Sequence, residues 1–116
     1  MLRIRKTNPQ LIRVIQILMR RREKIWRRVA KDLQKPRRRW RRVNLARINK
    51  YTKDGDVVVV PGKVLAFGSL DHKIKIWAFS FSKAAIEKIQ KAGGEILRID
   101  TLLQQNPRGS GVKLIG

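Results

Sequence analysis

The residues best suited to chemistry form a basic run at residues 35–42, whose sequence is KPRRRWRR. Guanidinium groups bind phosphate well because their planar fork donates two parallel hydrogen bonds to its oxygens. Pro36 excludes the run from the interior of a helix, and Trp40 adds a flat apolar face that could stack on a base or pack on the protein. Charges this dense repel one another, so the run is predicted to be shaped for a polyanion; a solvated charge run is the alternative.

The charge of the whole chain points to the same class of partner. The 116 residues hold 29 Lys and Arg against 8 Asp and Glu, a net charge of +21. Residues 1–50 carry 19 cations and 2 acids, whereas residues 51–116 carry 10 cations and 6 acids. This charge favours nucleic acid, with an anionic membrane surface as the weaker alternative. No apolar stretch is long enough to span a bilayer, so no transmembrane helix is expected. No strongly hydrophobic helix face lies around residues 20–24, so no membrane partner is predicted.

The length predicts a single domain over residues 1–116. Residues 1–50 are predicted to form a basic helical half that clamps RNA, and residues 51–116 a compact β/α half. The chain contains no cysteine, which excludes a disulfide framework and a thiolate zinc site.

Two amphipathic helices are predicted in the first half. Asn8 and Pro9 are typical of a helix start, because Asn caps free N–H groups and Pro suits the first helical position. The apolar residues that recur at helical spacing are Leu11, Val14, Ile15 and Leu18, then Ile25, Trp26, Val29, Ala30 and Leu33. The second set lies opposite a stripe of cations, Arg20, Lys24, Arg27, Lys31 and Lys35. The sequence leaves open whether the two helices are separate or continuous.

Short strands and helices alternate in the second half. Asn44 is predicted to cap a short helix. Residues 57–60 are β-branched and predict a strand, and Pro61-Gly62 predicts a type II turn before another strand at 63–67.

The strand predicted at residues 74–81 changes the parity of its apolar residues at Trp77, which a bulge or burial on both faces would explain. Ser82 is predicted to cap a helix that runs to Lys91. Trp26 and Trp77 lie in apolar patterns and are predicted to pack in the core, whereas Trp40 has no such pattern around it. The remaining predicted elements are a strand at 96–99, a brief helix ended by Asn106-Pro107, a glycine loop at 108–111 and a strand at 112–115.

Catalytic and metal sites are poorly supported. His72 is the only histidine and follows Asp71, but neighbours on a strand point to opposite faces, so no dyad is expected. The turns around Asp54, Asp56 and Asp71 explain these acids better than a metal ion does. No catalytic residue, cofactor, metal ion or small-molecule substrate is predicted, and the protein is not expected to be an enzyme.

RNA is favoured over DNA, because Arg-rich irregular segments that order on binding are typical of shape readout on folded RNA. The chain has no helix-turn-helix, zinc-finger or basic-zipper pattern, and a sequence-nonspecific DNA-compacting protein is the alternative. Lys63 and Arg108 are weaker phosphate candidates, because ordinary turns explain both of their loops. The predicted RNA-binding residues are Arg20, Lys24, Arg27, Arg28, Lys35, Arg37, Arg38, Arg39, Trp40, Arg41, Arg42, Lys63 and Arg108.

Several motifs occur in a fixed order, namely KTNP at 6–9, KPRR at 35–38, VNL at 43–45, VVVVPGKVL at 57–65 and NPRGS at 106–110. In this order they resemble the archaeal and eukaryotic large-subunit ribosomal protein family L-eighteen-e, over essentially the whole chain. The short length is typical of archaeal members. Arg42 departs from the family, in which an acid is expected there, and is expected to gain a phosphate contact.

The resemblance implies a structural constituent of the cytoplasmic large ribosomal subunit that binds large-subunit ribosomal RNA beside neighbouring ribosomal proteins. It also implies an α/β fold of irregular β-β-α turns, shared with the ribosomal protein family L-fifteen and preceded here by basic N-terminal helices.

Overall fold

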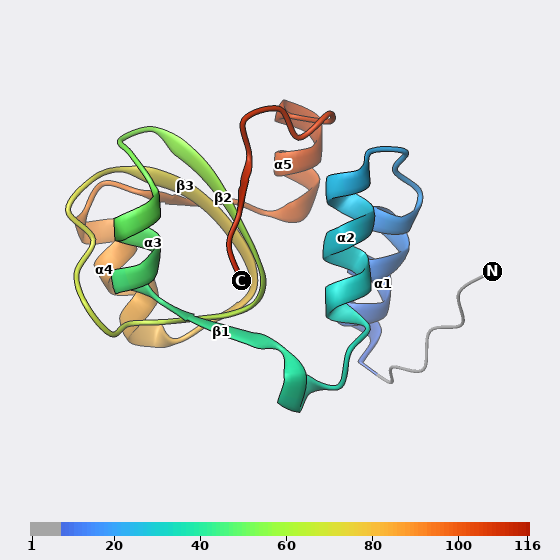
Figure 1. Ribbon diagram of the computed structural model, residues 1–116, viewed down its shortest axis with the longest axis horizontal. Helices are drawn as coiled ribbons and strands as arrows, with labels where there is room; N and C mark the ends of the chain where they lie inside the picture. Colours follow the sequence, from blue (N-terminus) through green and yellow to red (C-terminus); the bar gives the residue numbers. More distant parts are fainter. Residues whose placement is uncertain (1–7) are drawn as a thin grey trace.

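A parallel sheet lies between two groups of helices in the computed structural model, which describes residues 8–116 (Figure 1). On one side of the sheet are α1 (Pro9–Met19), α2 (Lys24–Leu33) and α5 (Ile99–Gln105). On the other side are α3 (Leu45–Tyr51) and α4 (Lys83–Lys91). The predicted α/β class with basic N-terminal helices is confirmed. None of the described helices is long and apolar enough to cross a bilayer.

The sheet is built from strands that all pair in parallel. The strands are β1 (Arg41–Asn44), β2 (Asp56–Leu65), β3 (Ile74–Phe81), β4 (Glu95–Ile96) and β5 (Lys113–Leu114). Their order is β1-β2-β3-β4, and β5 pairs with the first half of β2 while β1 pairs with its second half. Because β3 occupies the other edge of β2, β5 and β1 follow one another along the same edge.

The helices α1 and α2 form a hairpin whose apolar sides face the sheet. The Asn8 side chain caps α1 by accepting hydrogen bonds from the amides of Gln10 and Leu11 at 2.9 and 3.3 Å, as predicted. The two helices are separate, since Arg20 is already the C-cap of α1 and α2 begins at Lys24. Arg20 and Lys35 therefore lie outside α2, and the predicted cationic stripe is shorter than expected.

The turn predicted at Pro61-Gly62 is wrong, because β2 continues through both residues. The pairing of β2 with β3 shifts register between Val60 and Lys63, and this irregularity accommodates a proline that has no N–H to donate. Gly62 pairs with Arg41 of β1, and a Cβ at this glycine would collide with the Arg41 carbonyl. Long-range strand pairing has overridden the local turn preference.

Strand β3 is buried on both faces, which is one of the two explanations left open for its change of parity. Ile74, Ile76 and Ala78 pack in the core shared with α3 and α4. Trp77 packs in the core shared with α1, α2 and α5, and Phe79 lies against that core. The prediction that Trp77 is a core residue is confirmed.

The later elements are shorter than predicted. The strand expected at 96–99 covers only Glu95–Ile96, and Ile99 already begins α5. The strand expected at 112–115 covers only Lys113–Leu114. Ser82 and Asn44 both occupy the predicted N-cap positions. Ser82 accepts a hydrogen bond from the Ala85 amide at 3.1 Å, whereas the side chain of Asn44 makes no cap hydrogen bond.

Candidate nucleic-acid interface

The basic run, residues 35–42, is held against the protein by its tryptophan. Trp40 donates a hydrogen bond from Nε1 to the Lys35 carbonyl at 2.9 Å, and its ring meets Phe79 edge-on with centroids 5.3 Å apart. The Arg37 guanidinium lies 5.3 Å from the Trp40 ring centroid. Of the two roles left open for Trp40, the structure shows packing on the protein, because this residue holds the run against the core shared by α1, α2 and α5.

Most of the backbone of the run, from Arg37 onward, is regular. Arg37–Arg39 form one 3-10 turn after Pro36, and Arg41 and Arg42 belong to β1. The prediction of an irregular connector thus needs correction for these two arginines, whose backbone is paired with Gly62 and Lys63. The pattern missed this strand because four residues rich in arginine carry no β-propensity signal.

The arginine side chains of the run are exposed and largely unneutralised. All five, Arg37, Arg38, Arg39, Arg41 and Arg42, are exposed. Within residues 8–116 none of these five forms an ion pair. Their forks are therefore open to phosphate, which binds guanidinium through charge-assisted hydrogen bonds.

Lys63 is brought to the run by the sheet. It pairs with Arg42 in the register of β1 and β2, and both residues line a surface hollow of about 380 Å³. Arg37, Trp40 and Phe79 also line this hollow. The sequence could not place Lys63 here, because the contact joins segments 21 positions apart in the chain (Lys63 minus Arg42).

The predicted helical basic face, which consists of Arg20, Lys24, Arg27 and Arg28, is partly neutralised. Arg28 Nε lies 3.6 Å from Asp32 Oδ2, and the same carboxylate binds Lys35 Nζ at 3.3 Å. Arg27 donates from Nε to the Arg21 carbonyl at 3.1 Å. All four side chains remain exposed, but this face presents fewer free donors than its count of cations suggests.

Arg108 lies beside the start of α2. The Pro107 carbonyl accepts hydrogen bonds from Trp26 Nε1 at 2.7 Å and from Arg21 Nη2 at 3.0 Å. Gly109 packs against Ile25. These contacts bring the exposed Arg108 to the same end of the helical hairpin as Arg20 and so extend the helical basic face.

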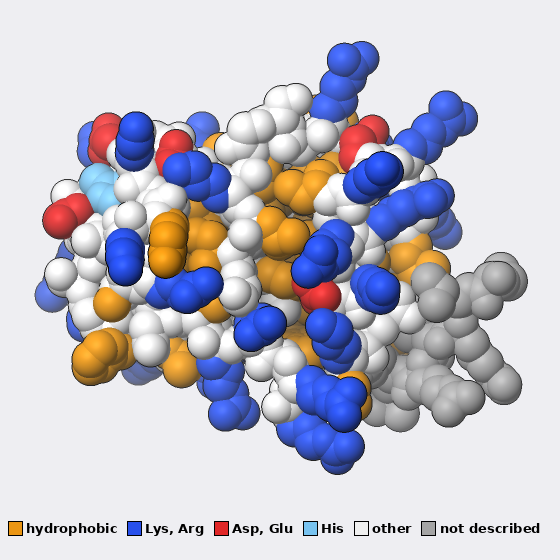
Figure 2. Space-filling view, in the orientation of Figure 1, with side chains coloured by type: hydrophobic (Ala, Val, Ile, Leu, Met, Phe, Trp, Pro, Cys, Tyr) orange, Lys and Arg blue, Asp and Glu red, His pale blue; other side chains and the backbone are white. Residues whose placement is uncertain are grey.

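The view in Figure 2 shows where the charges gather. Lys and Arg side chains cover the helical hairpin and the segment that joins α2 to β1, and Asp and Glu are sparse there. The surface is therefore suited to a polyanion over its length and has the charge expected of an RNA interface.

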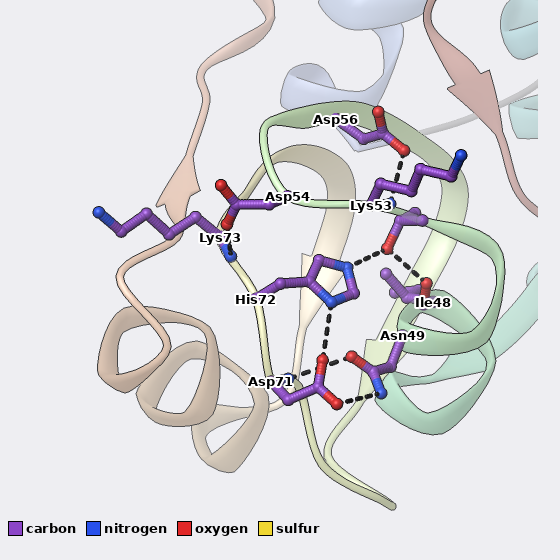
Figure 3. Close-up of polar contacts among 9 residues, drawn as sticks. Ile48, Asn49, Lys53, Asp54, Asp56, Asp71, His72 and Lys73 are labelled. Atoms are coloured by element: carbon purple, nitrogen blue, oxygen red, sulfur yellow. Dashed lines mark hydrogen bonds and ion pairs between the residues drawn. The ribbon is translucent and has the colours of Figure 1, made fainter.

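His72 and Asp71 do touch, contrary to the expectation from strand geometry. Both lie before β3, in a loop, and His72 Nδ1 is 2.8 Å from Asp71 Oδ1 (Figure 3). His72 Nε2 lies 2.6 Å from Thr52 Oγ1, which donates to the Ile48 carbonyl at 2.7 Å. Hydrogen bonds from His72 and Asn49 hold the pKa of Asp71 below its ordinary value.

This hydroxyl–imidazole–carboxylate chain joins the end of α3 to the loop. Thr52 is only 7% exposed, which keeps its hydroxyl from an external substrate. Two of the acids that could have formed a metal cluster accept backbone hydrogen bonds instead. Asp54 accepts from the Lys73 amide, and Asp56 accepts from the Lys53 amide. Within the described residues no cluster of three potential metal-ligating side chains is found.

The sequence reading missed a second group of cations, around Tyr51. The Arg47 guanidinium carbon and Lys50 Nζ lie 5.3 and 5.5 Å from the centroid of the Tyr51 ring. The four-residue spacing of Arg47 and Tyr51 on a helix could have indicated this pair. Lys113, which donates to the Tyr51 carbonyl at 3.0 Å, could only be found in the folded protein.

Comparisons with known proteins agree with one another. A family model described as "Ribosomal protein 60S L18 and 50S L18e" matches residues 5–116. Proteins named "Large ribosomal subunit protein eL18" are similar over almost the whole chain. The relative from Archaeoglobus fulgidus is 46% identical, with 97% of this chain and 99% of the relative covered. Those from Sulfurisphaera tokodaii and Methanoregula boonei are 45% and 44% identical, covering 94% and 97% of this chain and 92% and 96% of the relatives.

Proposed function

The chain belongs to the family of ribosomal proteins 60S L18 and 50S L18e, and from this premise we propose that it is a structural constituent of the large ribosomal subunit that binds its ribosomal RNA. The family assigned by resemblance and the family found by comparison are the same. Its site of action is the cytoplasmic ribosome, and its partners are large-subunit ribosomal RNA and neighbouring ribosomal proteins.

The observation that carries the RNA contact is the basic run. Its five arginines are exposed and form no ion pair within residues 8–116, and Trp40 and β1 hold them in place. A preorganised cluster loses less conformational entropy on binding than a flexible tail does. The run is therefore the principal phosphate contact, with Lys63 beside it and the helical basic face with Arg108 as the secondary contact.

The two halves of the chain divide this work unequally. Residues 1–50 hold most of the cations and act as the clamp. Residues 51–116 supply most of the sheet, and β1 of the clamp pairs with β2 of that sheet. The division is not a boundary in the fold, because β1 and α3 of the first half pack on the sheet of the second. Binding in this protein needs no catalysis, and Thr52, His72 and Asp71 serve to join α3 to its neighbouring loop.

Salt dependence tests the proposed function. Neutralising about 6–10 phosphates weakens binding by roughly 10³–10⁵ between 50 and 200 mM salt. We expect this fall for purified large-subunit ribosomal RNA in a filter-binding assay. We also expect the protein to stay on salt-washed large subunits in a sedimentation assay. An affinity that is independent of salt contradicts the proposal, and recovery only with chromosomal DNA supports a DNA-compacting protein instead.

A further inference from the structure

Tyr51 is an aromatic residue that the fold leaves uncovered. It is 50% exposed at the end of α3 and is one of the exposed large hydrophobic side chains of residues 8–116. Arg47 and Lys50 lie against its ring, and within residues 8–116 neither forms an ion pair. An exposed ring flanked by unneutralised cations is the combination that proteins use to hold nucleotides.

A surface hollow of about 390 Å³ adjoins the ring. It is lined by Arg47, Tyr51, the two residues of β5 and the two residues that follow them, Ile115 and Gly116. Leu114 is 37% exposed and gives the hollow an apolar wall. The hollow is therefore amphipathic, with an aromatic ring and an aliphatic side chain next to positive charge.

The walls of the hollow are fastened together. Lys113 Nζ donates to the Tyr51 carbonyl at 3.0 Å and forms an ion pair with Asp56 at 3.0 Å. Strand β5, which carries Lys113 and Leu114, pairs with Val58 and Val59 of β2. Since Asp56 is occupied by Lys113, it does not neutralise Arg47 or Lys50. Arg47 donates from Nη2 to the Gly116 carbonyl at 3.5 Å, a long hydrogen bond that leaves its other donors available.

The hollow is continuous with the basic run. Strands β5 and β1 follow one another along the same edge of β2, and Gly116 packs against Arg41 of the run. A Cβ at Gly116 would stand 3.3 Å from Arg41 Cγ. A polyanion bound to the run can therefore continue past Gly116 to Tyr51 without leaving the protein surface.

We propose that this surface, the Tyr51 site, binds an unpaired nucleotide of the RNA held by the basic run. The base stacks on the Tyr51 ring with its edge against Leu114, and Arg47 and Lys50 bind the adjoining phosphates. The assignment rests on the proposed function, because the occupant is part of that RNA. Stacking suits this site since unpaired bases expose a π-face that aromatic side chains recognise. A protein partner fits less well, because Lys50 and Lys113 are of a type depleted in protein interfaces, although Tyr and Arg are enriched there.

Substitutions at Tyr51 test the site through binding to purified large-subunit ribosomal RNA at several salt concentrations. Tyr51→Ala should weaken binding roughly 5- to 100-fold with an unchanged salt slope, because stacking releases no counterions. Tyr51→Phe should bind like the unaltered protein, since it keeps the ring. Arg47→Gln should reduce the salt slope by about 1, the signature of one lost phosphate contact. Ultraviolet cross-linking of the unaltered protein should join Tyr51 to RNA.

Phe67→Ala is the matched control. Phe67 is 74% exposed, but its neighbouring cation, Lys88, donates to the carbonyls of Ala66 and Gly68 at 2.8 Å each. Loss of this aromatic residue should leave RNA affinity unchanged. Because Ala favours helices and Lys113 bonds only the Tyr51 backbone, Tyr51→Ala should keep its fold, which circular dichroism checks.

The outcomes are separable. If the unaltered protein binds ribosomal RNA but Tyr51→Ala binds equally well and Tyr51 forms no cross-link, the Tyr51 site is overturned while the proposed function stands. If Tyr51→Ala binds RNA normally but no longer stays on large subunits, the occupant is a protein and the RNA assignment is overturned. If the unaltered protein binds no ribosomal RNA, the proposed function itself fails.

Discussion

The basic run and the helical basic face carry similar cations, but they differ in the acids around them. On the helix, Asp32 binds both Arg28 and Lys35, and the Arg21 carbonyl holds Arg27. In residues 37–42 no arginine forms an ion pair within the described part of the chain. A count of cations therefore overestimates the binding surface of the helix, because nearby carboxylates compete with phosphate for the same donors.

The two surfaces also differ in what holds them in shape. The shape of the helical basic face depends mainly on the local structure of α2, whose apolar residues are buried on one side by α1 and the sheet. The run depends on contacts made far along the chain, namely Trp40 with Phe79 and β1 with β2. We therefore expect the helical face to tolerate changes elsewhere in the protein better than the run does.

Removing the arginines of the run should give the largest effect. Replacing Arg37, Arg38, Arg39, Arg41 and Arg42 by Gln should weaken ribosomal RNA binding by roughly 10³-fold near 150 mM salt, with a clearly shallower salt slope. Replacing Arg20, Lys24, Arg27 and Arg28 by Gln should cost much less, because that face is partly neutralised. Filter binding across a salt series measures both. Equal losses for the two sets would show that the acids around the helix do not matter.

Removing the anchor of the run should come next. Trp40→Ala should lower the free energy of unfolding by about 1–3 kcal/mol through lost packing, and should weaken RNA binding because the arginines lose their fixed positions. Trp40→Phe should retain most of the stability and most of the RNA affinity, since it keeps an aromatic contact with Phe79. Urea unfolding measures the free energy of unfolding, and filter binding measures the RNA affinity. Weaker binding at unchanged stability would instead show that Trp40 stacks directly on a base.

Removing the acid should make the helical face resemble the run. Asp32→Asn removes the carboxylate that pairs with Arg28, so one more guanidinium of the helical basic face can bind phosphate and the salt slope for RNA binding should steepen by roughly 1. Stability should fall by about 1 kcal/mol or less, since both cations of these pairs are exposed even though Asp32 is partly buried. Glu87→Gln, an exposed acid on α4, removes the same charge at a distant place and is the control. An identical slope change in both variants would reduce the effect to net charge alone.

The smallest expected effect is on the pH dependence of stability. A hydrogen bond from the Lys53 amide, with help from Lys113, holds the pKa of Asp56 below its usual 3.8. A carboxyl with a depressed folded pKa stabilises the protein above its unfolded pKa and loses this contribution as pH falls through the folded value. Asp56→Asn should therefore lower the melting temperature slightly at pH 7 and flatten its decline below pH 4. The five arginines of the run, none of which forms an ion pair within residues 8–116, should add nothing to this decline. An unaltered profile in Asp56→Asn would contradict the assignment.

Much of the local structure could be predicted from the sequence, because its signals act within a few residues. The Asn8 and Ser82 caps, the spacing of Leu11 to Leu18 and the burial of β3 on both faces were all confirmed. The strand at Arg41–Asn44 and the passage of β2 through Pro61-Gly62 could not be predicted. Both depend on pairing between the two segments, which neither segment shows alone.

The candidate site divides in the same way. The sequence by itself determined the family, the excess of cations in residues 1–50 and the basic run as the place to bind phosphate, because charge and composition do not depend on folding. Only the tertiary structure decided which cations are free, that Trp40 packs on Phe79, and that Lys63 joins the run. It also brought Lys113 to Tyr51, across 62 positions of chain. The physical reason is that the side chains near a cation in space determine whether it can bind phosphate. Strand pairing and core packing determine which side chains those are.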